Sequence, residues 1–197
     1  MKIMQIDGSY LEGGGQILRT SIALSCLLNK AIRVFNIRKG RKKPGLKKQH
    51  ETAIKILRDF YNAKVKGLFV GSEEILFYPR ERRIPLYKSV DIGSSGSISL
   101  LLQAILPAII FGDSVITLDI AGGTAGLGSP TIEYTKHVIL KNLELLGVRT
   151  NLDILRQGFY PKGGGRVRLR IFQTKKLKPL ECCINRGKLK RLHGFSV

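Results

Sequence analysis

Two stretches of sequence decide the fold class: GGGQILRTSIALSCLL at residues 13–28 and GSSGSISLLLQAILPAIIF at residues 93–111. Each begins with small, turn-forming residues and continues with apolar residues, which predicts a helix that starts in a glycine-rich turn. The segments that follow also match, because the strand-like IRVFNIR at residues 32–38 recurs as VITLDIA at residues 115–121, 83 residues later. A pattern that returns at a nearly fixed interval indicates an internal repeat.

A second helix is predicted in each repeat, beginning near His50 and, 84 residues later, near Tyr134. Apolar residues recur there at helical spacing, so each helix should bury one face. The residues of these faces are Ala53, Ile54, Ile56, Leu57 and Phe60 in the first helix and Val138, Ile139, Leu143, Leu145 and Leu146 in the second. β-Branched and apolar content predicts strand pairs at Val65–Phe69 with Ile75–Tyr78 and at Thr150–Leu155 with Arg166–Phe172. The expected fold is therefore α+β, with tandem repeated units of two helices packed on a small sheet.

The repeat predicts a division of the chain into units at residues 1–84 and 85–185. Residues 187–197 alternate in polarity like the start of a new strand. We therefore expect residues 186–197 to begin a third unit that this chain does not complete.

The composition favours an anionic partner. Lys and Arg number 34 against 14 Asp and Glu, which gives a formal charge of +20 on 197 residues. This balance favours nucleic acid, nucleotides or acidic lipid without choosing among them. The longest apolar stretch, Ile98–Phe111, is interrupted by polar residues and is too short for a membrane span of about 20 residues. Three cysteines provide no disulfide framework, so we expect a cytoplasmic protein without membrane contact.

The first motif is DGSYLEGGGQILR at residues 7–19. Consecutive glycines at a helix start allow backbone N–H groups to approach an anion, and the helix dipole adds to the attraction. Glu12 could hold a cation there, and Arg19, one turn into the helix, could bind a phosphate with two hydrogen bonds. A plain turn remains the alternative, because the motif matches neither the P-loop nor the dinucleotide fingerprint.

The second motif is the basic segment at residues 37–50, IRKGRKKPGLKKQH. It connects a predicted strand to a predicted helix, so Arg38 and Arg41 should be displayed at the carboxyl end of a strand beside a helix N-terminus, where phosphates bind. A solvated basic loop is the alternative. Gln49 and His50 are either helix caps or ligands.

Two further glycine-rich segments lie in the second repeat. In the first, Ser and Gly at residues 93–97 can cap a helix whose apolar run contains Gln103, a polar residue that needs a partner. That partner is either a ligand or a hydrogen bond between repeats. The second, RQGFYPKGGGR at residues 156–166, is more typical of a hairpin turn with its aromatic residues packed inward. The histidines at 50, 137 and 193 suggest no catalytic triad or metal site.

Together these segments resemble the RNA 3'-terminal phosphate cyclases. The resemblance rests on the order and intervals of IDGSYLEGGGQILR, IRKGRKKPGLKKQH, IGSSGS, LLLQAILPA, AGGT and RQGFYPKGGG, which cover essentially the whole chain. It implies repeated units of two helices on a four-stranded sheet, related to the enolpyruvate transferases, and a smaller inserted domain beginning near residue 186. It also implies ATP-dependent chemistry: an enzyme histidine is adenylylated, AMP passes to the RNA 3'-phosphate, and the vicinal 2'-hydroxyl attacks to form a 2',3'-cyclic phosphate.

The resemblance also implies roles for individual residues. Glu12 should lie at the ATP triphosphate and at Mg²⁺ or another divalent cation. Gln103 and Pro130 should lie by the adenosine. The RNA terminal phosphate or the ATP phosphates should be surrounded by Arg19, Arg38, Arg41 and Gln49.

The chain departs from the family pattern in three respects. Ala125 and Gly128 stand where the family usually has Asp and, in many members, Trp. None of the three histidines matches the nucleophile, so we expect a truncated enzyme or one half of a split enzyme, inactive alone in self-adenylylation. Its partners would then be 3'-phosphorylated RNA, ATP, and a separate C-terminal half or further copies of the chain. The alternative is a non-catalytic RNA-binding relative that acts in ribosomal RNA processing.

Overall fold

The computed structural model describes residues 3–172, 174–180, 187–192 and 194. The first part of the chain forms a four-stranded sheet with strand order β1-β2-β4-β3. Only β1 and β2 are parallel, and the other pairs are antiparallel. The elements are β1 (Met4–Asp7), α1 (Gln16–Leu28), β2 (Ile32–Phe35), α2 (Lys48–Phe60), β3 (Lys64–Lys66) and β4 (Ile75–Tyr78).

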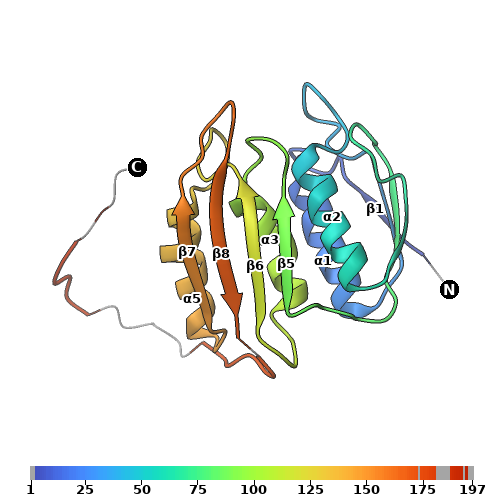
Figure 1. Cartoon of the computed structure of the whole chain (residues 1–197). Helices are drawn as coiled ribbons and strands as arrows, with labels where there is room; N and C mark the ends of the chain where they lie inside the picture. The colour runs from blue at the N-terminus through green and yellow to red at the C-terminus, as the bar shows by residue number, and fades with distance from the viewer. Residues whose placement is uncertain (1–2, 173, 181–186, 193, 195–197) are drawn as a thin grey trace.

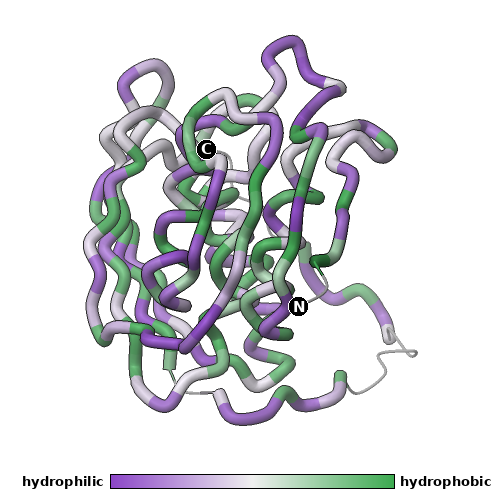
Figure 2. The backbone as a smooth tube through the Cα atoms, turned by 90° about the vertical axis from the view of Figure 1, so that its right-hand side faces the viewer, coloured by the Kyte–Doolittle hydropathy of each residue, from purple (hydrophilic) through white to green (hydrophobic). Residues whose placement is uncertain are grey.

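The second part repeats this arrangement, with strand order β5-β6-β8-β7 and again a single parallel pair, β5 with β6. Its elements are β5 (Tyr87–Asp91), α3 (Ile98–Ile109), β6 (Ile116–Gly122), the helical segments α4 (Ile132–Tyr134), η1 (Thr135–Ile139) and α5 (Leu140–Leu145), β7 (Thr150–Arg156) and β8 (Gly165–Ile171). The predicted α+β fold is confirmed. Hydrophobic and hydrophilic residues alternate along the longer strands, as the colour changes of Figure 2 show, because one face of each sheet is covered.

α1, α2 and α3 pack together and join the two parts into one hydrophobic core. α1 packs on the first sheet, and α3 packs on both α1 and α2. Figure 1 shows α3 and α5 behind the second sheet, with α1 and α2 at its β5 edge. The residues predicted for the buried face of α2 are all buried, as the amphipathic pattern indicated. The boundary between units at residue 84 stays a prediction.

The buried face predicted for the helix after Tyr134 is wrong in part. Val138 is 38% exposed and Leu145 is 62% exposed, whereas Ile132, Thr135 and Leu140 are buried. The segment contains a π-helical turn at Thr135–Ile139. An added residue per turn rotates the side chains that follow, so a face extrapolated at 3.6 residues per turn no longer points inward.

Two predicted strands differ in extent, since β3 spans Lys64–Lys66 where Val65–Phe69 was predicted and β2 is also shorter, and two strands were missed. β2 ends at Phe35 and not at residue 38, because Asn36 and Arg38 adopt positive φ angles of 53° and 57°. The parallel partners β1 and β5 were not predicted, since they are edge strands with mostly exposed or half-buried residues and no clear alternation.

The chain beyond residue 172 is described only in part. The described residues 187–192 form neither helix nor strand, so the strand predicted there is wrong for them. Cys182, Cys183 and His193 lie outside the described residues. Within the described part, no helix has the length and apolar character needed to cross a membrane.

Candidate phosphate and nucleotide site

Three helices begin at the same end of the molecule. α1, α2 and α3 start after the three segments singled out in the sequence, at Gln16, Lys48 and Ile98. Contacts between the starts are close: a Cβ atom on Gly15 would lie 2.6 Å from His50 Nε2, and Gln49 Oε1 accepts a 3.1 Å hydrogen bond from the Ser97 N–H. Helix N-termini carry partial positive charge and orphan N–H donors, so this end attracts anions.

His50 is a helix cap. It is 3% exposed, and its Nδ1 accepts a 3.1 Å hydrogen bond from the Lys47 N–H. That bond assigns the proton of the neutral imidazole to Nε2, on the side of Gly15. Burial, with Arg19, Arg38 and Lys47 nearby, lowers the pKa of His50 to about 3. The sequence left cap and ligand open for this residue, and the geometry favours the cap.

Arg19 lies beside the glycine turn without a carboxylate partner. Its Nη1 would be 3.0 Å from a Cβ atom on Gly15, so glycine leaves room for the guanidinium. Burial lowers the pKa of Arg19, and Glu12 opposes this shift. Among the described residues, no side chain or carbonyl accepts a hydrogen bond from it. A half-buried cation with unused donors is suited to an anionic ligand.

Arg41 and Glu12 form an exposed ion pair above this turn. The distance from Arg41 Nη2 to Glu12 Oε1 is 3.0 Å, with the two side chains 48% and 70% exposed. Such surface pairs contribute about 0–1 kcal/mol and exchange partners at little cost. Both groups are therefore accessible to a ligand and its counter-ion.

Arg38 is not displayed as the sequence predicted. It is 6% exposed, and its Nη1 donates to the carbonyls of Lys43 (2.9 Å) and Gly45 (2.7 Å). These bonds close the basic loop on itself. Burial and the charge of Arg41 lower the pKa of Arg38. Its contribution to anion binding would be through the fixed charge and the remaining donors.

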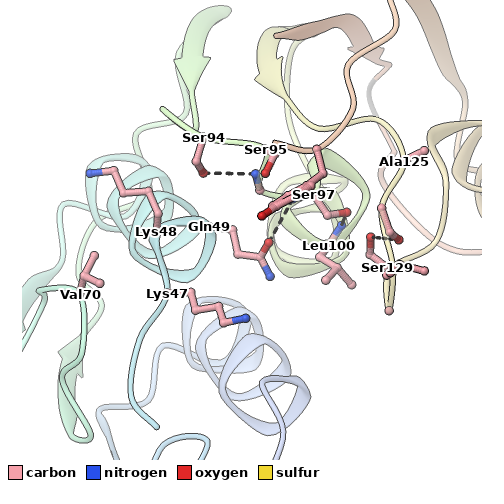
Figure 3. A pocket seen from close by; sticks show the side chains of 15 residues that line it. Lys47, Lys48, Gln49, Val70, Ser94, Ser95, Ser97, Leu100, Ala125 and Ser129 are labelled. Atoms are coloured by element: carbon pink, nitrogen blue, oxygen red, sulfur yellow. Dashed lines mark hydrogen bonds between the residues drawn. The ribbon is translucent and has the colours of Figure 1, made fainter. Parts of the chain in front are cut away.

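A cleft of about 720 Å³ opens next to the helix starts (Figure 3). Its walls come from the start of α2, the segment before α3, and the loop after β6. It is lined by Lys47, Lys48, Gln49, Val70, Ser94, Ser95, Gly96, Ser97, Leu100, Ala125, Gly126, Leu127, Gly128, Ser129 and Tyr160. The volume is in the range of pockets for small molecules, and the mixture of lysine, serine and apolar groups suits a nucleotide.

Hydrogen bonds to the hairpin after β7 fix the far wall of the cleft. The backbone N–H of Thr124 donates to the Gly158 carbonyl (2.8 Å), and the Gly158 N–H donates to Thr124 Oγ1 (2.9 Å). In the same hairpin, Phe159 is 59% and Tyr160 is 82% exposed, so the inward aromatic packing predicted from sequence is wrong. Tyr160 instead lines the cleft.

Only some of the predicted site residues lie at the cleft. Gln49 lines the cleft, Pro130 follows the rim residue Ser129, and Gln103 lies half-buried on α3, three residues after Leu100 and outside the cleft lining. Val70 was missed, because it comes from the loop between β3 and β4 and carries no motif. The roles of these residues stay predictions.

A resident metal cage is absent from the described residues. They contain no group of three or more His, Cys, Asp and Glu side chains placed to hold a metal. Glu12 is the carboxylate at the glycine turn. One carboxylate fits a Mg²⁺ ion that arrives with the phosphates of a nucleotide, since Mg²⁺ commonly keeps waters and phosphate oxygens as its other ligands.

Comparisons with known proteins agree with the sequence resemblance. A family model described as RNA 3'-terminal phosphate cyclase matches residues 10–193. Curated proteins named RNA 3'-terminal phosphate cyclase are similar: that of Desulfurococcus amylolyticus is 46% identical over 200 residues and that of Methanopyrus kandleri 44% over 196, each across 100% of this chain. That of Thermococcus kodakarensis is 48% identical over 182 residues, 92% of this chain. The chain spans 56%, 55% and 52% of the lengths of these relatives.

Proposed function

Because the chain belongs to the RNA 3'-terminal phosphate cyclase family, we propose that it contributes the phosphate- and nucleotide-binding part of an ATP-dependent conversion of an RNA 3'-phosphate to a 2',3'-cyclic phosphate. The observation that carries this proposal is the convergence of three helix N-termini beside a cleft of nucleotide size, with Arg19, which has no carboxylate partner in the described part of the chain. The adenosine and triphosphate would occupy the cleft, and the RNA terminal phosphate would lie at the glycine turn of α1.

The chemistry requires charge neutralisation. An oxygen of the RNA 3'-phosphate would attack the phosphorus of AMP carried on an enzyme histidine, and the imidazole would leave. The 2'-hydroxyl would then lose its proton to solvent and attack the RNA phosphorus while AMP leaves. Both steps have negative charge on phosphate oxygens in the transition state, which fixed cations and N–H donors stabilise. Arg19, Arg41 and the helix starts would supply these cations and donors, and Gln49 would orient the ligand from its position on the cleft wall.

Mg²⁺ would bind through Glu12 together with ligand phosphates. When bound, it supplies further neutralisation of phosphate charge. Glu12 would release Arg41, and the freed guanidinium would face the same phosphates. This exchange is inexpensive, because both side chains are exposed.

Replacing Arg19 by glutamine should weaken binding of 3'-phosphorylated RNA by roughly 10- to 100-fold, since hydrogen bonds to charged groups contribute about 1.5–3 kcal/mol. Fluorescence anisotropy with a short labelled RNA measures this, and the same RNA ending in a 3'-hydroxyl shows whether the terminal phosphate is the group that Arg19 binds. The matched control is Arg33→Gln, which also removes one arginine but one that is already paired with Glu74 at 2.6 Å. Equal losses in the two variants would contradict a specific role for Arg19.

The 197 residues alone should form no covalent adduct when incubated with labelled ATP and Mg²⁺. His50 is 3% exposed and its Nδ1 is already hydrogen-bonded, so it is unsuited as a nucleophile. Denaturing gels followed by phosphorimaging test this directly. Addition of the remaining C-terminal part of the Desulfurococcus amylolyticus relative should produce labelled protein and cyclised RNA, whereas a labelled band on this chain alone would refute the assignment.

A non-catalytic RNA-binding role in ribosomal RNA processing is the alternative. Such a protein would bind RNA without a preference for a 3'-phosphate and without ATP. The two assays above therefore also separate these functions.

A further inference from the structure

One arginine on the outer face of the second sheet differs from its neighbours. β8 presents Arg166, Arg168 and Arg170 on the same exposed face, which faces the viewer in Figure 1 with α3 and α5 behind the sheet. Arg168 is held by Asp119 through two hydrogen bonds of 2.7 and 2.8 Å, and Arg170 contacts Asp153 at 3.4 Å. Among the described residues, Arg166 has no such carboxylate partner.

Two more cations stand beside Arg166. Its partner across the β7–β8 pair is Arg156, so two like charges lie directly opposite each other. Like charges at opposed positions destabilise a sheet, and a bound anion would offset this repulsion. Lys162, in the hairpin that joins the two strands, lines one groove together with Arg156 and Arg166. The Nε of Arg156 donates to the Gly164 carbonyl at 2.6 Å, which fixes the guanidinium and leaves its terminal nitrogens available.

These side chains line a groove of about 320 Å³, which we call the Arg166 groove. Its floor is Ala121 of β6, which is in register with Asp91 on one side and Arg166 on the other. A methyl side chain between two longer ones leaves a hollow two strand spacings wide, about 10 Å. Three cations and the carboxylate of Asp91 line it. Asp91 Oδ1 accepts a 2.7 Å hydrogen bond from the Gly93 N–H, so the carboxylate is fixed at the edge.

The groove adjoins the nucleotide-sized cleft. Ser94 lines both cavities. The hairpin is packed tightly against this segment, since a Cβ atom on Gly163 would lie 2.8 Å from the Ser94 carbonyl oxygen. An RNA strand that leaves the site past Ser94 therefore enters a basic groove.

We propose that the Arg166 groove binds a backbone phosphodiester of the RNA strand, upstream of the 3' end, through Arg156, Lys162 and Arg166. The fixed Asp91 then accepts a hydrogen bond from a ribose hydroxyl across the groove. This inference rests on the proposed function and extends it, because it assigns a path to the substrate beyond its terminal phosphate. It also distinguishes this site from the Arg19 site, which would hold the 3'-terminal phosphate itself.

The test compares Arg166→Gln with Arg168→Gln. The two arginines lie on the same face of β8, and each substitution removes one positive charge. Both arginines are exposed, so both variants should fold, which circular dichroism checks. Binding is measured by fluorescence anisotropy with a labelled 3'-phosphorylated RNA octamer at several salt concentrations. ATP and a 3'-phosphorylated mononucleoside are the short ligands that should not reach the groove, and their binding is followed by calorimetry.

The expected result is a loss of about 10-fold in octamer affinity for Arg166→Gln, with the slope of log affinity against log salt reduced by about 1. Arg168→Gln should lose less than twofold, and both variants should bind ATP and the mononucleoside as the wild type does. Equal losses for the two variants would indicate non-specific electrostatic attraction and would contradict RNA binding in the Arg166 groove. Weaker ATP binding by Arg166→Gln would contradict it as well.

If only the assignment of the Arg166 groove is wrong, Arg19→Gln still weakens octamer binding while Arg166→Gln does not. If the proposed function is wrong, wild-type binding does not depend on the 3'-phosphate, and loss of Arg19 has no effect.

Discussion

Between pH 6.5 and pH 4, the wild-type chain should lose about 3 kcal/mol of unfolding free energy relative to a His50→Gln variant. His50 has a folded-state pKa of about 3 and an ordinary value of 6.5 when unfolded. Between these values the unfolded chain binds a proton that the folded chain does not. The contribution of neutral His50 to the free energy of unfolding is therefore fully present above pH 6.5. It falls by about 1.4 kcal/mol for each pH unit below that value.

The structural origin of this effect is the environment of the imidazole. His50 is buried, its Nδ1 accepts from the Lys47 N–H, and its low pKa comes first from burial and then from the charges of Arg19, Arg38 and Lys47. A proton on the ring would break the cap and add a charge to this cationic cluster. Glutamine at the same helix position keeps an acceptor for the Lys47 N–H and does not titrate.

Urea unfolding of both proteins at pH 7, 5.5 and 4 measures the effect. The difference between them removes the contributions of the other histidines and of the carboxylates, which the two chains share. Parallel changes in the two unfolding free energies would show that His50 is not protonated on unfolding and would contradict the cap assignment.

Much of the fold was accessible from sequence because the repeat and the helical periodicity are strong local signals. α1, α2 and α3 were predicted near their observed starts, since glycine-rich turns precede the apolar runs of α1 and α3 and apolar residues recur at helical spacing in α2. The helix after β6 was predicted with the wrong face, because a π-helical turn at Thr135–Ile139 leaves no trace in composition. β1 and β5 were missed because edge strands lack a two-residue alternation.

The positions of the site residues could be predicted from sequence only where the local sequence determines the geometry. Arg19 and Gln49 follow directly from helix starts, and the structure places both there. Arg38 was misplaced, because its positive φ angle and its bonds to two carbonyls of the same loop depend on how the loop closes. Tyr160 was also misjudged, since an exposed aromatic residue beside a cleft cannot be told from a buried one by a turn motif.

Replacing Gly158 by alanine should lower the free energy of unfolding by about 3 kcal/mol, because overpacking a closed site costs about 1–3 kcal/mol and the lost hydrogen bonds add to this. A Cβ atom there would lie 2.0 Å from the Gly165 backbone nitrogen and 2.5 Å from its Cα. The hairpin backbone would have to move, and both backbone partners of Thr124 would move with it. Urea unfolding monitored by circular dichroism gives the value.

Gly126→Ala is the matched control, in the loop that Thr124 anchors. The nearest atom to a Cβ at Gly126 is Ser129 Oγ at 3.8 Å, so this variant should stay within about 0.5 kcal/mol of the wild type. Similar stability of the two variants would show that the hairpin tolerates a methyl group at Gly158. If the difference appears, the same variants separate stability from function. Gly158→Ala should also weaken ATP binding under conditions where it remains folded, because the wall of the cleft depends on the Thr124–Gly158 hydrogen bonds.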